Sequence, residues 1–325
     1  MRYELPDWDA AVKALSEADE VAIACHVNPD GDALGSLLAA SLGLSKLGKK
    51  TYPTWGTSPA EVPSSYAFLP GLDSLVQPLE LPFTDTFLVL DCGSADRLGD
   101  AEAAARKATI SVNLDHHRGN GEFGTYNLVV PTASSTAELM TRMLDDLGVD
   151  LDLDIATCLY TGIVTDTGRF QYTNSSPDTL RLAADLLAFG VPAPRIAGEV
   201  FDSSPFGYLK LVGRVLDRAC LLQDDGFVYS WIEQHDLAET GVTMEETEKV
   251  IDLIRGTRAA DVAGLFKEQP DGGFRVSLRS KGPRTVDQIA RGMGGGGHHL
   301  AAGFSSDNIE ETVAYIVSGL RQHAG

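Results

Sequence analysis

The residues best suited to chemistry in this sequence are acidic and histidine side chains that follow short apolar runs. Asp115, His116 and His117 stand in a row directly after the apolar run 110–114. A carboxylate and two imidazoles can bind a divalent metal, orient a ligand or contact an anion. The triplet alone does not distinguish these roles, so its meaning depends on the segments that meet it in space.

A second polar segment, residues 26–32, follows the apolar run Val21–Cys25. Its Asn-Pro and Asp-Gly pairs are typical of turns, and Asp32 could cap the following helix, so a simple turn is one interpretation. The other interpretation starts from His26, which ends the strand, while Asp30 and Asp32 take alternate positions in the turn. A tight turn could direct these three side chains into one small volume.

Apolar runs and helical patterns alternate through the first half of the chain. The run 21–25 is continuously apolar, as expected of a parallel strand covered on both faces, and the runs 87–90 and 110–114 predict a second and a third buried strand. Helical patterns at 33–47 and 101–108 lie among them. This alternation predicts an α/β fold whose N-terminal part is a doubly wound, mostly parallel sheet with helices on both faces.

The polar segments share one position in this predicted sheet. His26, Asp91 and the triplet each follow a strand, at the edge where open α/β sheets bind ligands. Asp166 extends the core-facing stripe of a helix expected at 153–167. Taken one at a time, Asp91 would more often be a strand-end cap and Asp166 a cap of a neighbouring turn. A lone His117 would more often be a core histidine whose hydrogen bonds are satisfied. Because four segments converge on one edge, we interpret them as a functional site.

The donor set indicates which ligand this site would hold. Carboxylates and imidazoles without thiolates favour Mn²⁺ or Mg²⁺, with Zn²⁺ or Co²⁺ as alternatives. With six or more ligands available, two metal ions sharing a carboxylate is the economical arrangement. A pair about 3.5–4 Å apart suits in-line displacement at phosphorus and lowers the pKa of a bridging water.

The pattern changes beyond about residue 190. A helix expected at 179–189 is closed by Gly190 and followed by Pro192 and Pro194, so we place a helical connector at 191–217. The catalytic domain would then span 1–190, and a smaller α+β domain would span 218–325. For that domain we expect strands at 221–222, 227–232 and 274–278, and helices at 244–254 and 308–320.

Two features of the second domain could bind an anion. Residues 294–297 are four consecutive glycines, which alone are typical of a flexible linker. His298 and the compact stretch 300–303 follow at once, which favours a packed turn whose N–H groups approach a phosphate or base. Upstream, residues 275–291 carry five cations against one acid, which is either a solvated face or a local basic strip.

The totals limit the classes of function. A net charge of −20 over 325 residues argues against binding to long nucleic acid or an anionic membrane, although bound metal would still admit a small anionic substrate. Four widely spaced cysteines suit a reducing compartment. The N-terminus lacks a signal-peptide pattern, and the longest apolar stretch, 33–45, is too short to span a bilayer. We therefore expect a cytoplasmic enzyme.

Taken together, these segments resemble the DHH phosphoesterase superfamily, whose signature includes Asp115-His116-His117. Its other motifs are present as H-x-x-P-D-x-D at 26–32, a strand-end Asp91, and Asp166 in T-D-T-G. Residues 294–303 resemble the G-G-G-H-x-x-A-A-G motif of the associated DHHA1 domain. The resemblance covers nearly the whole chain, with no departure at a metal-ligand position.

The resemblance implies a role for each residue. One metal ion would be held by His26, Asp30 and Asp91. The other would be held by Asp32, Asp91, His116 and Asp166, so that Asp91 bridges. The catalytic residues would be Asp91, His117 at the scissile phosphate or leaving group, and Asp115, which orients the histidines. The terminal nucleotide and phosphate of the substrate would be bound by Arg279, Ser280, Gly296, Gly297 and His298.

Length and two-domain layout are most similar to the nanoRNase group of this superfamily, the bifunctional oligoribonucleases that also dephosphorylate pAp (3′-phosphoadenosine 5′-phosphate). This implies hydrolysis of RNAs of two to five nucleotides to nucleoside monophosphates and of pAp to AMP, with two metal ions (Mn²⁺, or else Mg²⁺ or Co²⁺), in a homodimer.

Other activities remain open at this stage. They are phosphodiesterase activity on cyclic or linear dinucleotide signals (c-di-AMP, pApA), a RecJ-like single-strand DNA exonuclease, a family II inorganic pyrophosphatase, and a non-catalytic nucleotide-binding module. The pyrophosphatases lack the glycine–histidine motif, the exonucleases usually carry further domains, and the intact ligand set argues against the binding module. The sequence does not rank pAp, short RNA and dinucleotides as substrates.

Overall fold

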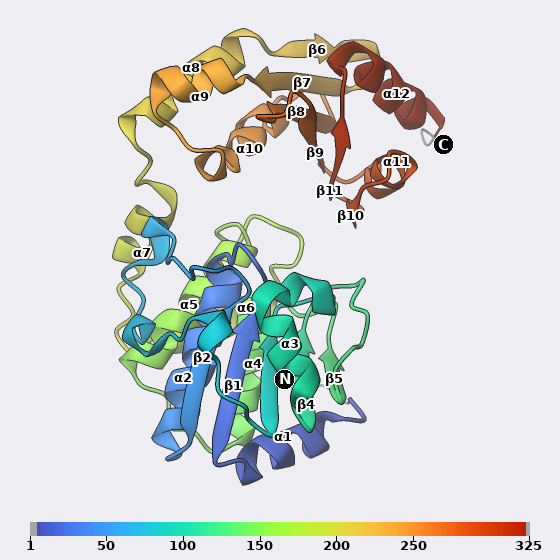
Figure 1. Cartoon of the computed structure of the whole chain (residues 1–325). Helices are drawn as coiled ribbons and strands as arrows, with labels where there is room; N and C mark the ends of the chain where they lie inside the picture. Colours follow the sequence, from blue (N-terminus) through green and yellow to red (C-terminus); the bar gives the residue numbers. More distant parts are fainter. Residues whose placement is uncertain (1–4, 323–325) are drawn as a thin grey trace. The chain divides into compact units, whose positions relative to one another are not determined.

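A computed structural model describes residues 5–322, and the chain divides after Ser203 into two compact units (Figure 1). The division falls inside the segment 191–217, which the sequence predicts to be a helical connector. Each unit has its own sheet and its own buried apolar core.

The first unit is built on a five-stranded, entirely parallel sheet in the order β2-β1-β3-β4-β5. Its strands are β1 (Glu20–Cys25), β2 (Lys50–Trp55), β3 (Thr86–Leu90), β4 (Ile110–Asp115) and β5 (Tyr126–Val129). The strand order reverses between β1 and β3, so the switch point of the sheet lies between the strands that precede His26 and Asp91.

Helices cover both faces of this sheet, which confirms the predicted α/β fold. One face packs on α2 (Gly31–Lys46), α4 (Thr136–Asp146) and α5 (Leu153–Asp166). The other packs on the 3-10 segment η4 (Ala95–Ala101) and α3 (Glu102–Lys107). The remaining helical elements of the unit are α1 (Trp8–Glu17), α6 (Pro177–Leu187), α7 (Ala193–Phe201), η1 (Ser64–Tyr66), η2 (Leu72–Ser74) and η3 (Pro78–Glu80).

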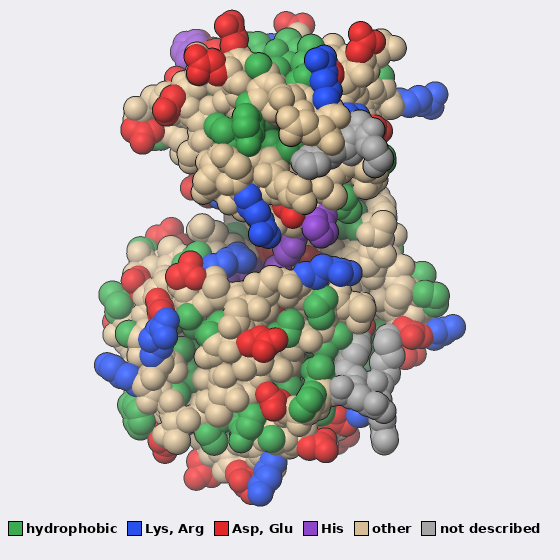
Figure 2. Space-filling view, turned by 90° about the vertical axis from the view of Figure 1, so that its right-hand side faces the viewer, with side chains coloured by type: hydrophobic (Ala, Val, Ile, Leu, Met, Phe, Trp, Pro, Cys, Tyr) green, Lys and Arg blue, Asp and Glu red, His purple; other side chains and the backbone are tan. Residues whose placement is uncertain are grey.

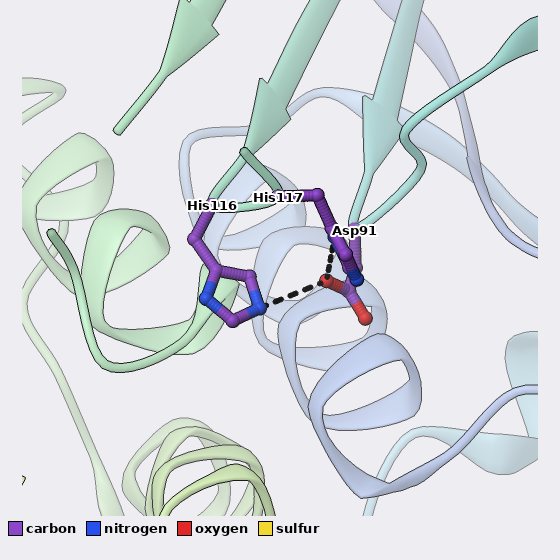
Figure 3. A group of neighbouring side chains, drawn as sticks. All are labelled: Asp91, His116 and His117. Atoms are coloured by element: carbon purple, nitrogen blue, oxygen red, sulfur yellow. Dashed lines mark ion pairs between the residues drawn. The ribbon is translucent and has the colours of Figure 1, made fainter. Parts of the chain in front are cut away.

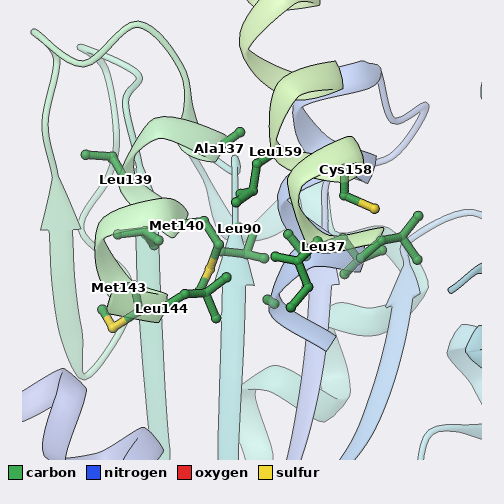
Figure 4. Packing of buried hydrophobic residues seen from close by; sticks show 14 of the residues in the cluster. Leu37, Leu90, Ala137, Leu139, Met140, Met143, Leu144, Cys158 and Leu159 are labelled. Atoms are coloured by element: carbon green, nitrogen blue, oxygen red, sulfur yellow. The ribbon is translucent and has the colours of Figure 1, made fainter. Parts of the chain in front are cut away.

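The main core of the first unit lies between the sheet and the layer of α2, α4 and α5. Leu37, Leu90 and Leu159 are fully buried there (Figure 4). Helices α2 and α5 are in close contact at Gly35, where an added Cβ would lie 2.4 Å from the Cys158 carbonyl oxygen. This contact fixes the spacing of the two helices that carry Asp32 and Asp166.

Gly35→Ala is therefore expected to destabilise the first unit by about 1–3 kcal/mol, because a backbone oxygen cannot move away as a flexible side chain could. Urea unfolding followed by circular dichroism would measure the loss. Gly198→Ala in α7 is the matched control, since a Cβ there meets nothing within 4 Å. It should stabilise its helix by about 0.5–1 kcal/mol, and equal effects of the two substitutions would contradict the packing argument.

The second unit is a mixed six-stranded sheet in the order β10-β11-β9-β8-β7-β6, in which only β7 and β8 run parallel. The strands are β6 (Cys220–Leu222), β7 (Phe227–Ile232), β8 (Val262–Glu268), β9 (Phe274–Ser280), β10 (Gly296–His298) and β11 (Ala301–Ser306). This arrangement agrees with the predicted smaller α+β domain.

Helices again pack on both faces of this sheet. One face is covered by α8 (Phe206–Asp217), α9 (Gln234–Thr240) and α10 (Val250–Arg255), and the other by α11 (Asp287–Gly292) and α12 (Ile309–Gln322). Two 3-10 turns complete the unit, η5 (Gln223–Asp225) and η6 (Glu245–Thr247). The single helix predicted at 244–254 is wrong, because the structure has two short elements there, η6 and α10, separated by a turn at residues 248–249.

The polarity of the helices and the distribution of acidic side chains agree with the composition. Among residues 5–322, every helix is too short or too polar to cross a lipid bilayer. On the face shown in Figure 2, acidic side chains are scattered over both units instead of forming one patch.

Candidate metal centre

The polar residues singled out in the first half of the sequence meet at the carboxyl edge of the parallel sheet. His26 follows β1. Asp91 follows β3, and His116 and His117 follow β4 (Figure 3). Asp30 and Asp32 lie at the start of α2, and Asp166 is the last residue of α5. The ends of these strands and helices therefore place all of these side chains at one end of the sheet.

The turn after β1 caps helix α2 and also places two carboxylates at the edge of the sheet. Asp30 is the N-cap of α2, because its Oδ1 accepts from the N–H groups of Asp32 and Ala33 at 3.0 Å each. Asp32 does not cap its own helix. Its carboxylate accepts from the N–H groups of Thr136 (2.7 Å) and Ala137 (2.8 Å) at the start of α4. The positive end of α4 thus supports a buried carboxylate.

Asp91 lies at the centre of the cluster. Its Oδ2 is 3.4 Å from His26 Nε2, while its Oδ1 is 3.6 Å from His116 Nε2 and 3.5 Å from His117 Nδ1. The hydroxyl of Thr136 donates to the same Oδ1 at 3.0 Å. The backbone of Asp91 is left-handed, with φ of 55°, a conformation that costs about 1–3 kcal/mol in a non-glycine residue and is found mostly at functional sites.

The side chains form three overlapping groups, each with its ligand atoms within 4.8 Å of one another. The groups are His26, Asp30 and Asp91; Asp32, His116 and Asp166; and Asp91, His116 and His117. His116 Nε2 lies 3.8 Å from a carboxylate oxygen of Asp32 and 3.6 Å from one of Asp166. Donors that share a metal at about 2.0–2.2 Å are roughly 3–3.5 Å apart, so this spacing suits a common cation better than direct hydrogen bonds.

Two acids of the cluster, Asp32 and Asp166, need a neutralising partner. Asp32 is only 1% exposed. Burial raises the pKa of Asp32 well above its usual value, and the nearby charges of Asp91 and Asp166 raise it further. Burial likewise raises the pKa of Asp166 to about 7, although His116 opposes the shift. Protons or divalent cations could neutralise such a group, and this donor set is one that divalent cations prefer.

An unsatisfied amide supports the same interpretation. The Nδ2 of Asn174 donates to the carbonyl of Ser134 (2.8 Å) and to the carbonyl and carboxylate of Asp166 (3.2 and 3.3 Å). The Oδ1 of Asn174 is buried with no hydrogen-bond partner among the described residues. An open acceptor on a side chain that contacts Asp166 could accept a hydrogen bond from a metal-bound water. The residues present therefore fit divalent metal.

A second layer of hydrogen bonds holds the histidine pair. Asp115 Oδ1 accepts from His117 Nδ1 (2.7 Å) and from the N–H of His116 (2.8 Å). Burial would lower the pKa of His117, but the carboxylates of Asp115 and Asp91 outweigh it and raise the pKa to about 9. Asn120 Nδ2 donates to Asp115 Oδ2 at 2.6 Å and to the Cys92 carbonyl at 3.2 Å. Asn120 thus joins the ends of β3 and β4 and fixes the carboxylate that orients His117.

Asn120→Asp is expected to lower turnover about tenfold or more while leaving metal affinity unchanged, because the new carboxylate faces Asp115 and pushes it away from His117. Steady-state kinetics and metal titration would separate the two effects. Asn127→Asp in the following strand β5 is the control, since the side-chain amide of Asn127 bonds only Gly124. If Asn120→Asp lowered activity in a His117→Ala background by the same factor, its effect would not pass through His117.

The residues predicted to bind substrate lie in the second unit. Gly296, Gly297 and His298 form β10, and Arg279 and Ser280 end β9. Arg279 pairs in register with Ala301, which in turn pairs with His298, so these three occupy one row across the sheet. Ser280 is buried, with its hydroxyl donating to the Arg284 carbonyl and accepting from the N–H of Gly282. Its side chain builds the turn, and its contact with substrate stays a prediction.

Sequence reasoning missed three polar residues of the first unit: Thr136, Asn120 and Asn174. Only Thr136 could have been suspected from the sequence, because it lies at the start of a helix, where backbone N–H groups are available to bind a carboxylate. The two asparagines lie in irregular loops after a ligand, where no periodicity marks them.

Comparisons with known proteins show which family this chain is similar to. A model of the N-terminal domain of the DHH family matches residues 20–163, and a model of the DHHA1 domain matches residues 224–322. A protein of Thermus thermophilus described as bifunctional oligoribonuclease and PAP phosphatase NrnA is 34% identical over 294 residues, or 90% of this chain and 86% of that protein.

Solved structures share the fold. An exopolyphosphatase-related protein of Bacteroides fragilis superposes with a TM-score of 0.89 at 24% identity, covering 97% of this chain and 96% of that one. RecJ of Thermus thermophilus, solved in complex with Mn²⁺, superposes with a TM-score of 0.60 at 16% identity, covering 98% of this chain and 55% of that one.

The parallel sheet with its acid–histidine edge and the separate mixed sheet together define a two-unit phosphoesterase. The chain belongs to the DHH family, with a DHHA1 domain as its second unit.

Proposed function

We propose that this protein is a metal-dependent phosphoesterase that hydrolyses oligoribonucleotides of two to five nucleotides to nucleoside monophosphates and pAp to AMP. The observation that carries the proposal is the pair of overlapping ligand groups that share Asp91, one of them with His26 and the other with His116. The relative of Thermus thermophilus described as an oligoribonuclease and PAP phosphatase supports this choice of substrate.

Each residue then has a defined task. His26, Asp30 and Asp91 hold one divalent ion, and the other ion is held by Asp32, Asp91, His116 and Asp166. Two such ions, with Mn²⁺ the best match to the donors and Mg²⁺ or Co²⁺ as alternatives, supply a water of lowered pKa and neutralise charge on the phosphate.

His117 contacts the scissile phosphate or leaving group. Its Nδ1 hydrogen-bonds to Oδ1 of Asp115, which fixes the orientation of the imidazole ring. A ring fixed in this way keeps its orientation through the reaction, because Asn120 prevents the carboxylate of Asp115 from turning.

In the second unit, Arg279, Ser280, Gly296, Gly297 and His298 bind the terminal nucleotide and its phosphate. An arginine can contact a phosphate with two parallel hydrogen bonds or stack on a base. We further propose a cytoplasmic homodimer, with a catalytic domain over 1–190, a connector over 191–217 and a substrate-binding domain over 218–325.

Side-by-side turnover with Mn²⁺ tests the proposal. The substrates are pAp, pApA, a five-nucleotide RNA, long single-stranded DNA and pyrophosphate, each with an EDTA control. We expect turnover of pAp and of the short RNA, and its loss with EDTA. Preference for the long DNA or for pyrophosphate would overturn the choice of substrate, and full turnover without metal would overturn the mechanism.

A further inference from the structure

The two faces of the sheet in the second unit are not covered equally along its width. On β8, residues 262–267 are all buried, so helices cover both faces there. On β9 and β11 burial alternates strictly, with Val276, Leu278, Ala302 and Phe304 buried and their neighbours partly or fully exposed. One face of this part of the sheet is therefore open.

The open face carries small and cationic side chains. Strand register sorts its residues into three rows, which are Arg279–Ala301–His298, Ser277–Gly303–Gly296, and Arg275–Ser305. The middle of the face thus consists of glycine, alanine and serine, with an arginine at each end of β9. A ribose or base could lie directly on such a floor, within reach of the serine hydroxyls.

The two arginines of this face differ from four other arginines of the same unit. Arg214, Arg218, Arg284 and Arg321 each pair with an acid. Arg275 and Arg279 form no ion pair with any acid between residues 5 and 322, although the chain has 46 acids and 26 cations. Lys267, the register neighbour of Arg275, is buried and already paired with Glu248. The free cations of β9 are thus concentrated on its open face.

The separation of the two guanidinium-bearing positions suits a short strand of nucleic acid. Four residues along a β-strand span about 13 Å. This is the rise of about four stacked nucleotides at roughly 3.4 Å each, or of fewer nucleotides in a stretched strand. A ligand that extends along the strand from one arginine position to the other is therefore longer than a mononucleotide such as pAp.

An open face of an antiparallel sheet often only faces water, and such faces usually carry mixed charges. The open face of β9 and β11 instead carries two unpaired cations, no acid and a floor without bulky side chains. This combination is complementary to a polyanion that lies flat on the sheet.

We propose that the open face of β9 and β11 binds the nucleotides of an RNA substrate that lie beyond the terminal one, with Arg275 as their phosphate contact. The inference rests on the proposed function and names the element that selects substrate length. Row Arg279–Ala301–His298 holds the terminal nucleotide, and Arg275 adds affinity only when the substrate is long enough to reach it.

Arg275→Ala tests this inference with the full-length protein and a series comprising pAp and RNAs of two, three, four and five nucleotides. We expect kcat/KM for the four- and five-nucleotide RNAs to fall about tenfold or more, the scale of one lost charge-assisted hydrogen bond, mainly through KM. Turnover of pAp and of the dinucleotide should not change. The salt dependence of binding to the five-nucleotide RNA should weaken by about one phosphate contact.

Arg321→Ala is the matched control, because it removes the same charge from α12, which packs on the opposite face. It should leave the whole length series unchanged. If Arg275→Ala lowered pAp and five-nucleotide turnover equally, or changed neither, the inference would be wrong.

Equilibrium binding of the same RNAs without added metal separates this inference from the proposed function. If wild-type protein hydrolyses none of them but binds the longer ones more tightly, and Arg275→Ala removes that difference, the open face binds RNA and the proposed activity fails. If wild-type protein hydrolyses short RNA and Arg275→Ala binds every length as wild type does, the activity stands and the open face is not a binding surface.

Discussion

Asp91→Asn is expected to abolish hydrolysis and the metal-dependent rise in melting temperature together. Asp91 is the ligand common to two of the three groups at the sheet edge, and its two oxygens face different histidines. The amide keeps the size of the side chain but loses the charge and one acceptor oxygen, so neither ion would be held in place. Turnover should fall about a thousandfold or more.

The measurement pairs kinetics with thermal unfolding at increasing Mn²⁺. A ligand that binds only the folded protein stabilises it by about 2.7 kcal/mol at a hundredfold excess over its Kd, and this gain should vanish in Asp91→Asn. Asp100→Asn is the control, because Asp100 is an exposed acid in the following η4 segment. A variant that lost turnover but kept the full Mn²⁺-dependent stabilisation would show that Asp91 acts in catalysis without holding metal.

The parts of the first unit that could be predicted are those where burial requires a recognisable pattern of apolar residues in the sequence. The runs before His26 and Asp91 are continuously apolar because β1 and β3 are central strands covered on both faces, while the run before Asp115 has apolar residues at alternate positions. Chain connectivity then required their carboxyl ends to meet at one edge. The position of these site residues followed from the pattern without knowledge of any contact.

The edge strands β2 and β5 lack that apolar pattern. β2 begins with Lys50 and contains Pro53, and β5 has only four residues, of which Leu128 alone is buried. A strand that pairs on one side needs fewer apolar residues, so it resembles a loop in sequence. In the second unit, residues 262–266 are apolar enough for a buried strand, but a run of this length is equally consistent with a helix.

The supporting residues of the site could not be predicted for a different reason. Asn120 and Asn174 act through single hydrogen bonds to a neighbouring carboxylate, and such bonds depend on the path of a loop rather than on residue periodicity. The same holds for Asp30 and Asp32, whose capping roles are distributed differently from the expectation. Asp30 caps its own helix, while Asp32 accepts from the start of α4, which is more than 100 residues away.

The open face of the second unit shows what register adds to sequence. The cations between 275 and 291 look alike in the sequence, but the fold separates them. Arg284 pairs with Asp261, and Lys281 donates to the carbonyl of Thr257, so both serve the structure of the unit. Arg275 and Arg279 share one face because they are four residues apart on a strand, which residue counting can reveal only once the strand is known.

His116→Ala and His117→Ala are expected to fail in different ways although the residues are adjacent. His116 Nε2 faces the carboxylates of Asp32, Asp91 and Asp166, so its loss should weaken Mn²⁺ binding and turnover together. His117 is held through Nδ1 by Asp115, which fixes the ring that we propose to contact the substrate. Its loss should lower kcat about 10²–10⁴-fold, the usual scale for a positioned acid–base group, with metal affinity retained.

A comparison of leaving groups shows whether His117 acts on the departing oxygen or only on the phosphate. If it assists the leaving group, His117→Ala should slow release of a ribose hydroxyl far more than release of p-nitrophenolate, which needs no proton. Equal losses for the two substrates would restrict His117 to binding the phosphate. His235→Ala, at an exposed histidine of α9, should change neither rate. Loss of Mn²⁺ binding in His117→Ala to the same extent as in His116→Ala would make His117 a metal ligand instead, because only a ligand contributes directly to metal affinity.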